Sequence, residues 1–272
     1  MFSVKAPQEE LIQRTRQVLK KYSLNTVCEE SLCPNMGECF GEGTATFLIL
    51  GRFCTRACKY CNVSTGKPKA PDISEPVRLY YAIRELKLKY VVLTSVDRDD
   101  LPDYGARHFR RCVEFLRSRD KDLGVEVLTP DFQGSIEALE EIIVSQPQVI
   151  AHNIEVVEGL FPRVRPQGDY KRSLKVLEYY AKSGVKVKSG LMVGFGEREE
   201  EVFKTLEDLK GVGVSLLVIG QYLRPTTKHY PVEKVYTGEE FEHLRDKALS
   251  MGFERVLAKP LARPSYHAKD ML

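Results

Sequence analysis

Short apolar runs alternate with amphipathic stretches along the chain from Thr46 onward. The runs have the length and the residue content of strands, and they span residues 46–51, 90–95, 125–129, 148–152, 185–189 and 214–220. Helical periodicity is centred on residues 75–88, 105–119, 134–146, 170–183, 197–210 and 239–251. Six β–α units in series predict parallel strands joined by right-handed crossovers. The expected fold class is α/β, a partial (β/α)6 TIM-like barrel, although an open sheet also fits because a closed barrel needs eight units.

The two ends of the chain differ from these central units. Residues 9–22 have helical periodicity, whereas residues 28–44 carry proline, asparagine and several glycines and are expected to be loop. The tail after Lys259 is irregular. This pattern predicts three parts, an N-terminal extension at 1–44, a barrel at 45–258 and a C-terminal tail at 259–272.

The bulk composition is that of an ordinary globular enzyme. Charged residues make up 29% of the 272 positions, and a net charge of +3 is too weak to predict nucleic-acid binding. The longest apolar runs, such as 212–220, are far shorter than the ~20 residues of a membrane span. Residues 1–10 contain no apolar segment of the signal-peptide type, and seven cysteines is an odd number for a disulfide framework. We therefore expect a cytoplasmic protein, not associated with membranes, whose thiols bind metal.

Six of the seven cysteines form two triplets of different spacing. The first triplet is Cys28, Cys33 and Cys39, spaced C-x4-C-x5-C, and the second is Cys54, Cys58 and Cys61, spaced C-x3-C-x2-C. Thiolates are soft ligands that suit iron–sulfur clusters or zinc. A four-iron cubane takes four ligands, so a triplet leaves one iron open for chemistry. The second triplet follows the first predicted strand, at the end of a parallel strand where barrel enzymes hold their active sites.

A structural zinc site is the alternative interpretation of the second triplet. Such sites use four ligands, commonly arranged as paired C-x2-C knuckles. Here one C-x2-C pair has a third cysteine upstream and no fourth ligand nearby. Zinc would therefore need a distant histidine to complete its coordination.

The second triplet, with aromatic Tyr60 before its last cysteine, resembles the radical S-adenosylmethionine (SAM) superfamily. The resemblance implies a 4Fe–4S cluster on Cys54, Cys58 and Cys61. It also implies SAM as a cofactor, whose methionine amino and carboxylate groups chelate the open iron. Reduction of the sulfonium then yields a 5′-deoxyadenosyl radical, and the protein supplies positioning and exclusion of water.

The first triplet, within Cys33-Pro-Asn-Met-Gly-Glu-Cys39, is similar to the lipoyl synthase family specifically. Further matching stretches lie at residues 43–47, 94–100, 129–132, 152–155, 188–194, 220–223 and 263–268, so the resemblance covers about 25–268. It implies that the two extensions carry an auxiliary 4Fe–4S cluster, held by the first triplet and by a C-terminal serine that matches Ser265. A serine oxygen is a hard ligand on a soft site, which suits a cluster that is dismantled to release sulfur. Ser265 could instead merely end a turn.

One departure from the family pattern precedes Ser265. The family usually has serine where this chain has Pro264. The proline ring restricts its own φ and pushes Arg263 towards an extended conformation. We therefore expect an extended, stiffened approach to the serine ligand.

Polar residues after two other strands are candidates for SAM binding. Ser95 and Asp97 follow the second predicted strand and could bind the methionine amino group, although a turn that caps the next helix is the alternative. Asn153 and Glu155 end the fourth predicted strand and could hydrogen-bond the ribose.

The remaining thiol and three of the histidines have simpler interpretations. Cys112 falls at an apolar position of a predicted helix and is expected to be buried. His108, His229 and His243 lie among charged residues and are expected at the surface.

The resemblance implies an enzyme, a sulfurtransferase that inserts two sulfur atoms at C6 and C8 of a protein-bound octanoyl-lysyl group. The implied partners are an octanoylated lipoyl-carrier protein (a lipoyl domain or a glycine-cleavage H protein) and an electron donor such as ferredoxin or flavodoxin. The alternatives are another radical SAM enzyme with an auxiliary cluster, such as a methylthiotransferase, and a two-cluster electron carrier. The first would have its second cysteine set in a separate domain, and the second would need neither six β–α units nor an open iron.

Overall fold

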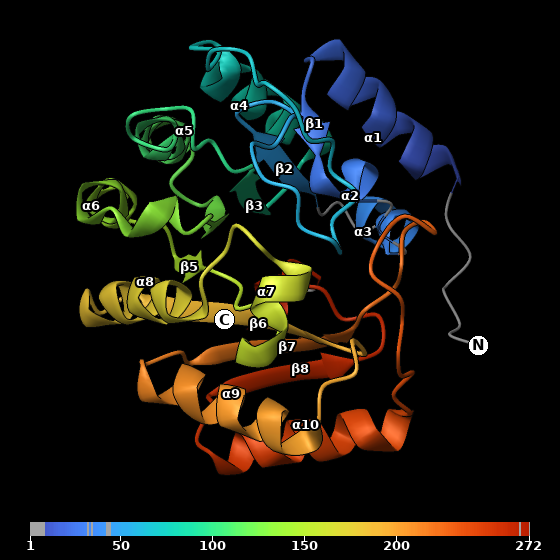
Figure 1. Ribbon diagram of the computed structural model, residues 1–272. Helices are drawn as coiled ribbons and strands as arrows, with labels where there is room; N and C mark the ends of the chain where they lie inside the picture. The colour runs from blue at the N-terminus through green and yellow to red at the C-terminus, as the bar shows by residue number, and fades with distance from the viewer. Residues whose placement is uncertain (1–8, 32, 34, 42–44, 267, 272) are drawn as a thin grey trace. The chain divides into compact units, whose positions relative to one another are not determined.

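The computed structural model describes residues 9–31, 33, 35–41, 45–266 and 268–271. Backbone contacts divide the chain into two compact units (Figure 1). The first unit comprises residues 1–55 and 62–148, and the second comprises 56–61 and 149–272. This division separates the strands into two groups. The three parts expected from the sequence are different, because they separate the two ends of the chain from the central β–α units.

The first unit contains four strands in chain order. β1 (Asn25–Thr26) pairs antiparallel with β2 (Thr46–Ile49), which pairs parallel with β3 (Tyr90–Ser95), and β3 pairs parallel with β4 (Gly124–Leu128). All four residues of β2 are buried, as are the first five of β3. Such continuous burial is expected for parallel strands covered on both faces.

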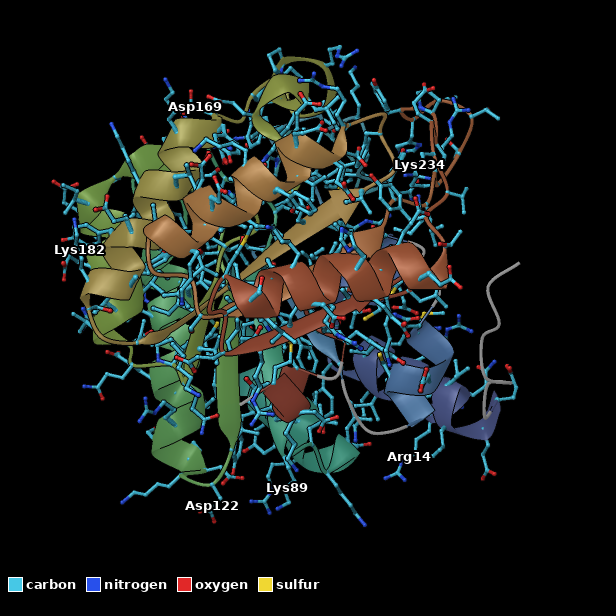
Figure 2. The ribbon with its side chains drawn as sticks, turned by 90° about the horizontal axis from the view of Figure 1, so that it is seen from below. Arg14, Lys89, Asp122, Asp169, Lys182 and Lys234 are labelled. Atoms are coloured by element: carbon cyan, nitrogen blue, oxygen red, sulfur yellow. The ribbon has the colours of Figure 1, made fainter. Side chains whose placement is uncertain are left out.

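Helices α4 (Glu75–Leu86) and α5 (Ala106–Arg119) connect the parallel strands of the first unit, and α6 (Ile136–Val144) follows β4. The three helices pack side by side (Figure 1). Each turns an apolar stripe inward, for example Phe109, Val113 and Leu116 of α5, all fully buried. The 3₁₀ turn η1 (Phe132–Gly134) precedes α6. The loops before β3 and β4 reach the same side of the molecule, where Figure 2 shows Lys89 and Asp122.

The N-terminal part of the first unit is more helical than the sequence predicted. α1 (Glu9–Lys21) matches the expected helix, but α2 (Val27–Glu30) and α3 (Met36–Gly41) lie in the segment expected to be loop. Thr26 caps α2, because its hydroxyl accepts a hydrogen bond from the amide of Glu29 at 3.3 Å. Single-turn helices of this kind are too short for sequence periodicity to reveal.

The second unit also contains four strands in chain order, all parallel. They are β5 (Val149–Ala151), β6 (Lys186–Val193), β7 (Leu216–Gln221) and β8 (Arg255–Lys259). β8 was not predicted from the sequence. Its ends, Arg255 and Lys259, are exposed, so its apolar run is short.

Helices α8 (Tyr170–Lys182), α9 (Glu199–Gly211) and α10 (Gly238–Ser250) connect these strands. The short elements η2 (Glu158–Leu160), α7 (Phe161–Val164) and η3 (Ala268–Met271) complete the unit. Asp169 caps α8 through a 2.6 Å bond from the amide of Arg172, and Figure 2 shows Asp169 and Lys182 at the two ends of this helix. In the C-terminal segment, Ala262 and Met271 join Val149, Leu216 and Val218 in one buried apolar cluster.

The six strands and six connecting helices predicted from Thr46 onward are all confirmed, and β1 and β8 are additions. The architecture is a mostly parallel α/β fold of the partial-barrel class. Among the described residues, no helix combines the length and the apolar character needed to cross a bilayer.

The first unit should depend strongly on the burial of β3. Leu93 is fully buried and is paired with Phe47 and Val127. Replacing it with alanine should lower the free energy of unfolding by about 2–5 kcal/mol, because it leaves a cavity that the sheet cannot close. Ile136→Ala is the control, since Ile136 is 55% exposed and should change stability by less than ~0.5 kcal/mol. Urea titration followed by circular dichroism measures both, and equal losses would contradict this account of the core.

Candidate functional site

The loop after β2 carries Cys54, and its backbone is held by hydrogen bonds within the first unit. The amide of Cys54 donates to the carbonyl of Ser64 at 2.8 Å, and the amide of Gly66 donates to the carbonyl of Cys54 at 3.0 Å. The Cys54 thiol lies 3.7 Å from Oδ2 of Asp97, to which it donates. The structure therefore brings the predicted residue Asp97 to the first cysteine of the second triplet.

Cys58 and Cys61 belong to the second unit, where the loop after β7 contacts Lys59 and Cys61. The amide of Cys61 donates to the carbonyl of Cys58 at 3.1 Å and closes a turn. His229 Nε2 lies 3.1 Å from the carbonyl oxygen of Cys61, and the amide of Tyr230 donates to the carbonyl of Lys59 at 2.9 Å. Sequence reasoning expected His229 merely at the surface. It missed this contact because His229 and Cys61 are 168 positions apart.

Tyr60 lies next to these two cysteines and is partly buried. Removal of its hydroxyl from water raises the pKa of Tyr60 well above its ordinary value, and the charges of Cys58 and Glu155 add to the effect. The phenol therefore stays neutral at any physiological pH.

Ser95 is the last residue of β3, Asp97 follows the strand by two positions, and their side chains have different hydrogen-bond partners. The hydroxyl of Ser95 donates to the carbonyl of Val96 at 2.9 Å and keeps its lone pairs available. The alternative that this turn caps the next helix is wrong, because α5 starts after Gly105 with no side-chain hydrogen bond at its cap.

Asn153 and Glu155 are brought together in the second unit. Nδ2 of Asn153 donates to Oε1 of Glu155 at 3.2 Å. Glu155 has a φ of 69°, an unusual value for a residue other than glycine, and its backbone bonds to Gly190 and Met192 on β6 at 3.0 and 2.8 Å. Oδ1 of Asn153 is buried without a hydrogen-bond partner among the described residues. A buried acceptor of this kind needs a donor, such as a ligand hydroxyl.

The first triplet lies in the N-terminal part of the first unit, with Cys28 in α2, Cys39 in α3 and Cys33 between the two helices. The amide of Cys33 donates to the carbonyl of Cys28 at 3.0 Å, and the amide of Cys39 donates to that of Asn35 at 2.9 Å. Burial, with a smaller contribution from Cys33, raises the pKa of Cys28 to about 12, while hydrogen bonds from Thr46 act in the opposite direction. Cys28 is therefore a protonated thiol until a metal displaces its proton.

The C-terminal segment that carries Ser265 forms a turn in the second unit. The amide of Tyr266 donates to the carbonyl of Arg263 at 2.9 Å, which places Pro264 second and Ser265 third in a β-turn. Pro264 favours this turn because the second position requires its restricted φ. The expectation that residues 263–266 are extended is therefore wrong. Pro264 restricts the backbone of this segment, as expected, but it does so within a turn.

Two glycines make room for this turn on the sheet of the second unit. A Cβ atom on Gly190 of β6 would lie 2.8 Å from Cγ of Pro264 and 2.8 Å from Oδ1 of Asn153. A Cβ atom on Gly220 of β7 would collide with the carbonyl oxygen of Ala262. The C-terminal turn thus packs directly on β6 and β7, beside the candidate residue Asn153.

The donor set fits iron–sulfur chemistry, since each triplet offers three soft thiols from a short segment. Within the described ranges, no group of three or more His, Cys, Asp or Glu side chains that could hold a metal ion is found. Metal sites commonly form together with local folding, so such a group need not exist before metal binds. Ser265 belongs to the second unit and the first triplet to the first, so their shared coordination stays a prediction.

Pro34, Gly43 and Thr44 of the quoted motifs, together with His267, lie outside the described residues.

Comparisons with known proteins agree on one family. Residues 48–209 match the model of the Radical SAM superfamily. The chain is 50% identical to a lipoyl synthase of Aquifex aeolicus, over 96% of this chain and 95% of the relative. It is 47% identical to a lipoyl synthase of Haemophilus influenzae, over 94% of this chain and 81% of the relative. The crystal structure of Streptococcus suis SuiB bound to precursor peptide SuiA has a similar fold, with a TM-score of 0.58 at 11% identity, covering 95% of this chain and 56% of the other.

The glycine contacts predict that Gly220→Ala will displace the C-terminal turn. The added methyl group collides with backbone of the tail, which cannot move away as a side chain could, and overpacking of this kind costs about 1–3 kcal/mol. Limited proteolysis followed by mass spectrometry should show faster cleavage within residues 259–266. Gly238→Ala is the matched control, because nothing lies within 4 Å of its added Cβ atom. Equal cleavage rates in the two variants would refute the packing described above.

Proposed function

The chain belongs to the lipoyl synthase family of the radical SAM superfamily, and on this premise we propose which of its residues carry the family's chemistry. The protein is an enzyme, a sulfurtransferase of the radical SAM type. It inserts two sulfur atoms, at C6 and C8, into a protein-bound octanoyl-lysyl group. The observation that carries this conclusion is 50% identity over 96% of the chain.

A 4Fe–4S cluster and SAM are the cofactors of the radical SAM domain. We assign the three ligands of this cluster to Cys54, Cys58 and Cys61, whose spacing is that of the superfamily motif. When bound, these cofactors supply the radical that removes hydrogen from an unactivated C–H bond, which no side-chain base could deprotonate. The task of the protein is to hold the acyl chain close to the radical and away from water, since hydrogen abstraction tolerates little misplacement.

Four residues are proposed to bind SAM. Asp97 and the lone pairs of Ser95 can accept hydrogen bonds from the methionine amino group, and Asp97 already lies beside Cys54. Asn153 and Glu155 are proposed to bind the ribose. The support for the ribose site is the buried Oδ1 atom of Asn153, which a ribose hydroxyl would satisfy.

The first triplet is proposed to hold a second, auxiliary 4Fe–4S cluster, with Ser265 as its fourth and displaceable ligand. The buried, protonated thiol of Cys28 supports a site that forms only when metal displaces the proton. The turn at Arg263–Tyr266 supports a ligand that is presented in a fixed orientation. Ser265 would be catalytic in this proposal, because its hard oxygen would hold the cluster less firmly than a thiolate and would leave the cluster available as the source of sulfur.

The lipoyl synthase assignment implies a substrate carried by a protein. We propose an octanoylated lipoyl domain or glycine-cleavage H protein as that partner, and a ferredoxin or flavodoxin as the electron donor. We further propose three parts at 1–44, 45–258 and 259–272, in which the two end segments jointly hold the auxiliary cluster. A cytoplasmic location, without membrane or nucleic-acid partners, completes the proposal.

The function is tested by anaerobic incubation of the reconstituted protein with an octanoyl-lysyl peptide, SAM and a reductant. Mass spectrometry should show two sulfur atoms added to each peptide. Cleavage of SAM without addition of sulfur would leave the protein a radical SAM enzyme but would contradict the lipoyl synthase assignment. Transfer of a methylthio group would identify it as a methylthiotransferase.

Replacement of each cysteine triplet by alanine should separate the two roles. The variant at Cys54, Cys58 and Cys61 should lose SAM cleavage entirely, because the open iron is gone. The variant at Cys28, Cys33 and Cys39 should retain cleavage but add no sulfur. Iron analysis should find about eight irons in the wild type and about four in each variant, as two cubanes imply. The sulfur-donor assignment is wrong if the second of these variants still makes lipoyl product.

Ser265 should control sulfur release rather than cluster assembly. Ser265→Ala should still bind about four irons at the first triplet through three thiolates, yet yield little product. Ser265→Cys should hold the cluster more tightly and release sulfur more slowly, because a thiolate is the better soft ligand. Single-turnover rates and the signals of the two clusters in electron paramagnetic resonance measure these effects. Ser250→Ala, at an exposed position in α10, is the control, and wild-type turnover in both Ser265 variants would exclude Ser265 as a ligand.

A further inference from the structure

Leu50, the residue between β2 and the cysteine loop, has an unusual backbone conformation. Its φ is 68°, in the left-handed region that favours glycine, and Gly51 follows with a φ of 89°. Leu50 is only 3% exposed. A leucine in this conformation persists only where its surroundings hold it there.

The amide of Leu50 is held by a buried carboxylate. It donates to Oε2 of Glu75 at 3.1 Å, and Nε2 of His108 lies 2.6 Å from the same oxygen. The side chains of Glu75 and His108 are 7% and 3% exposed. His108 was expected at the surface, but it lies on the buried face of α5, where its partner comes from α4. A buried carboxylate is retained only when it is paired, which explains the histidine.

The carbonyl of Leu50 is held by a buried guanidinium. Nη1 of Arg98 donates to it at 3.2 Å. The other nitrogens of Arg98 form a two-pronged contact with Asp100, at 2.8 Å from each carboxylate oxygen, which lowers the pKa of Asp100. Arg98 is 1% exposed, so its planar fork is fixed in one orientation.

Residues 97–100, which include Arg98 and Asp100, also hold Thr55, the residue directly after Cys54. The carbonyl of Asp97 accepts the amide of Thr55 at 3.1 Å and its hydroxyl at 3.0 Å. The same hydroxyl accepts a hydrogen bond from the amide of Asp99 at 3.1 Å. On the remaining side, a Cβ atom on Gly105 would collide with Cδ1 of Leu50, so the leucine side chain is packed against backbone. The loop that carries Cys54 is therefore fixed at its first residue and just beyond its cysteine.

We propose that Glu75, His108, Arg98 and Asp100 form a peptide clamp on Leu50 that positions Cys54 for cluster binding. The four residues are positioning residues: they act on the cysteine only through the backbone of residues 50–54. The clamp imposes the left-handed conformation of Leu50, and this conformation directs the chain out of β2 into the loop. The role of this loop in binding the radical cluster rests on the function proposed above. The contacts that fix Leu50 are independent of that function.

Hydrogen exchange of the full-length, metal-free protein tests the clamp directly. The amides of Cys54 and Thr55 are bonded to the carbonyls of Ser64 and Asp97, so they have protection to lose. In Arg98→Lys the charge remains but the fork is lost, and in Glu75→Gln the charge-assisted bond is lost. Each variant should exchange faster at residues 51–55 by about tenfold, the effect expected for loss of one hydrogen bond to a charged group.

Leu116→Ala is the matched control. Leu116 is fully buried in α5, two turns beyond His108, so its loss weakens the unit without touching Leu50. Faster exchange at residues 51–55 in the clamp variants, with wild-type exchange there in the control, supports the proposal. Unchanged exchange in the clamp variants overturns it, as does an equal increase in the control. If Glu75→Gln does not fold, Asp100→Asn replaces it, because Asp100 is 35% exposed and its loss only frees Arg98.

Iron loss from the reconstituted protein provides a second measurement. Arg98→Lys should release the cluster at the second triplet to a chelator several-fold faster than wild type, and the control should not. Equal release from both variants overturns the role in cluster positioning. Hydrogen exchange is measured without a cluster, so its result does not depend on the proposed function. Failure of the wild-type protein to make lipoyl product would refute the proposed function but would not change the exchange result.

Discussion

Parallel pairing of strands is the constraint on which the candidate site depends. Parallel strands deliver their following loops to the same edge of a sheet, so loops far apart in sequence become neighbours. In the first unit, β2 and β3 are parallel, and the loops after them meet where Asp97 contacts Cys54 and Thr55. In the second unit, the loop after β7 meets the turn of Cys58 and Cys61 through His229.

Backbone conformation and the absence of side chains determine the course of the segments near the candidate site. Leu50 and Glu155 both have positive φ values, Leu50 directly after β2 and Glu155 four residues after the end of β5. Gly190 and Gly220 serve the opposite purpose, since their missing side chains allow the C-terminal turn to pack on β6 and β7. Backbone strain at Leu50 and Glu155 thus directs the chain after β2 and β5. The missing side chains of Gly190 and Gly220 leave the space that the C-terminal turn occupies.

Burial also gives the two triplets different surroundings. Cys28 is buried and its pKa is raised to about 12, so its thiol gives up a proton only in exchange for a metal. Cys54, Cys58 and Cys61 are all partly exposed, which fits the proposal that they would hold a cluster with one iron open to a cofactor. Neighbouring carboxylate and imidazole groups, from Asp97 and His229, contact this second triplet.

The amino-acid sequence alone determined the class of fold and the chemistry of the ligands. Short continuous apolar runs located six strands, helical periodicity located six connecting helices, and cysteine spacing identified the thiol triplets, because all three signals are local. It did not reveal β8, whose ends are polar, or the single turn of α2. Nor could it reveal that His108 is buried against Glu75, that His229 reaches Cys61, or that Pro264 lies on Gly190. These contacts join residues 33 to 168 positions apart, and only the packing of strands and helices decides which distant side chains meet.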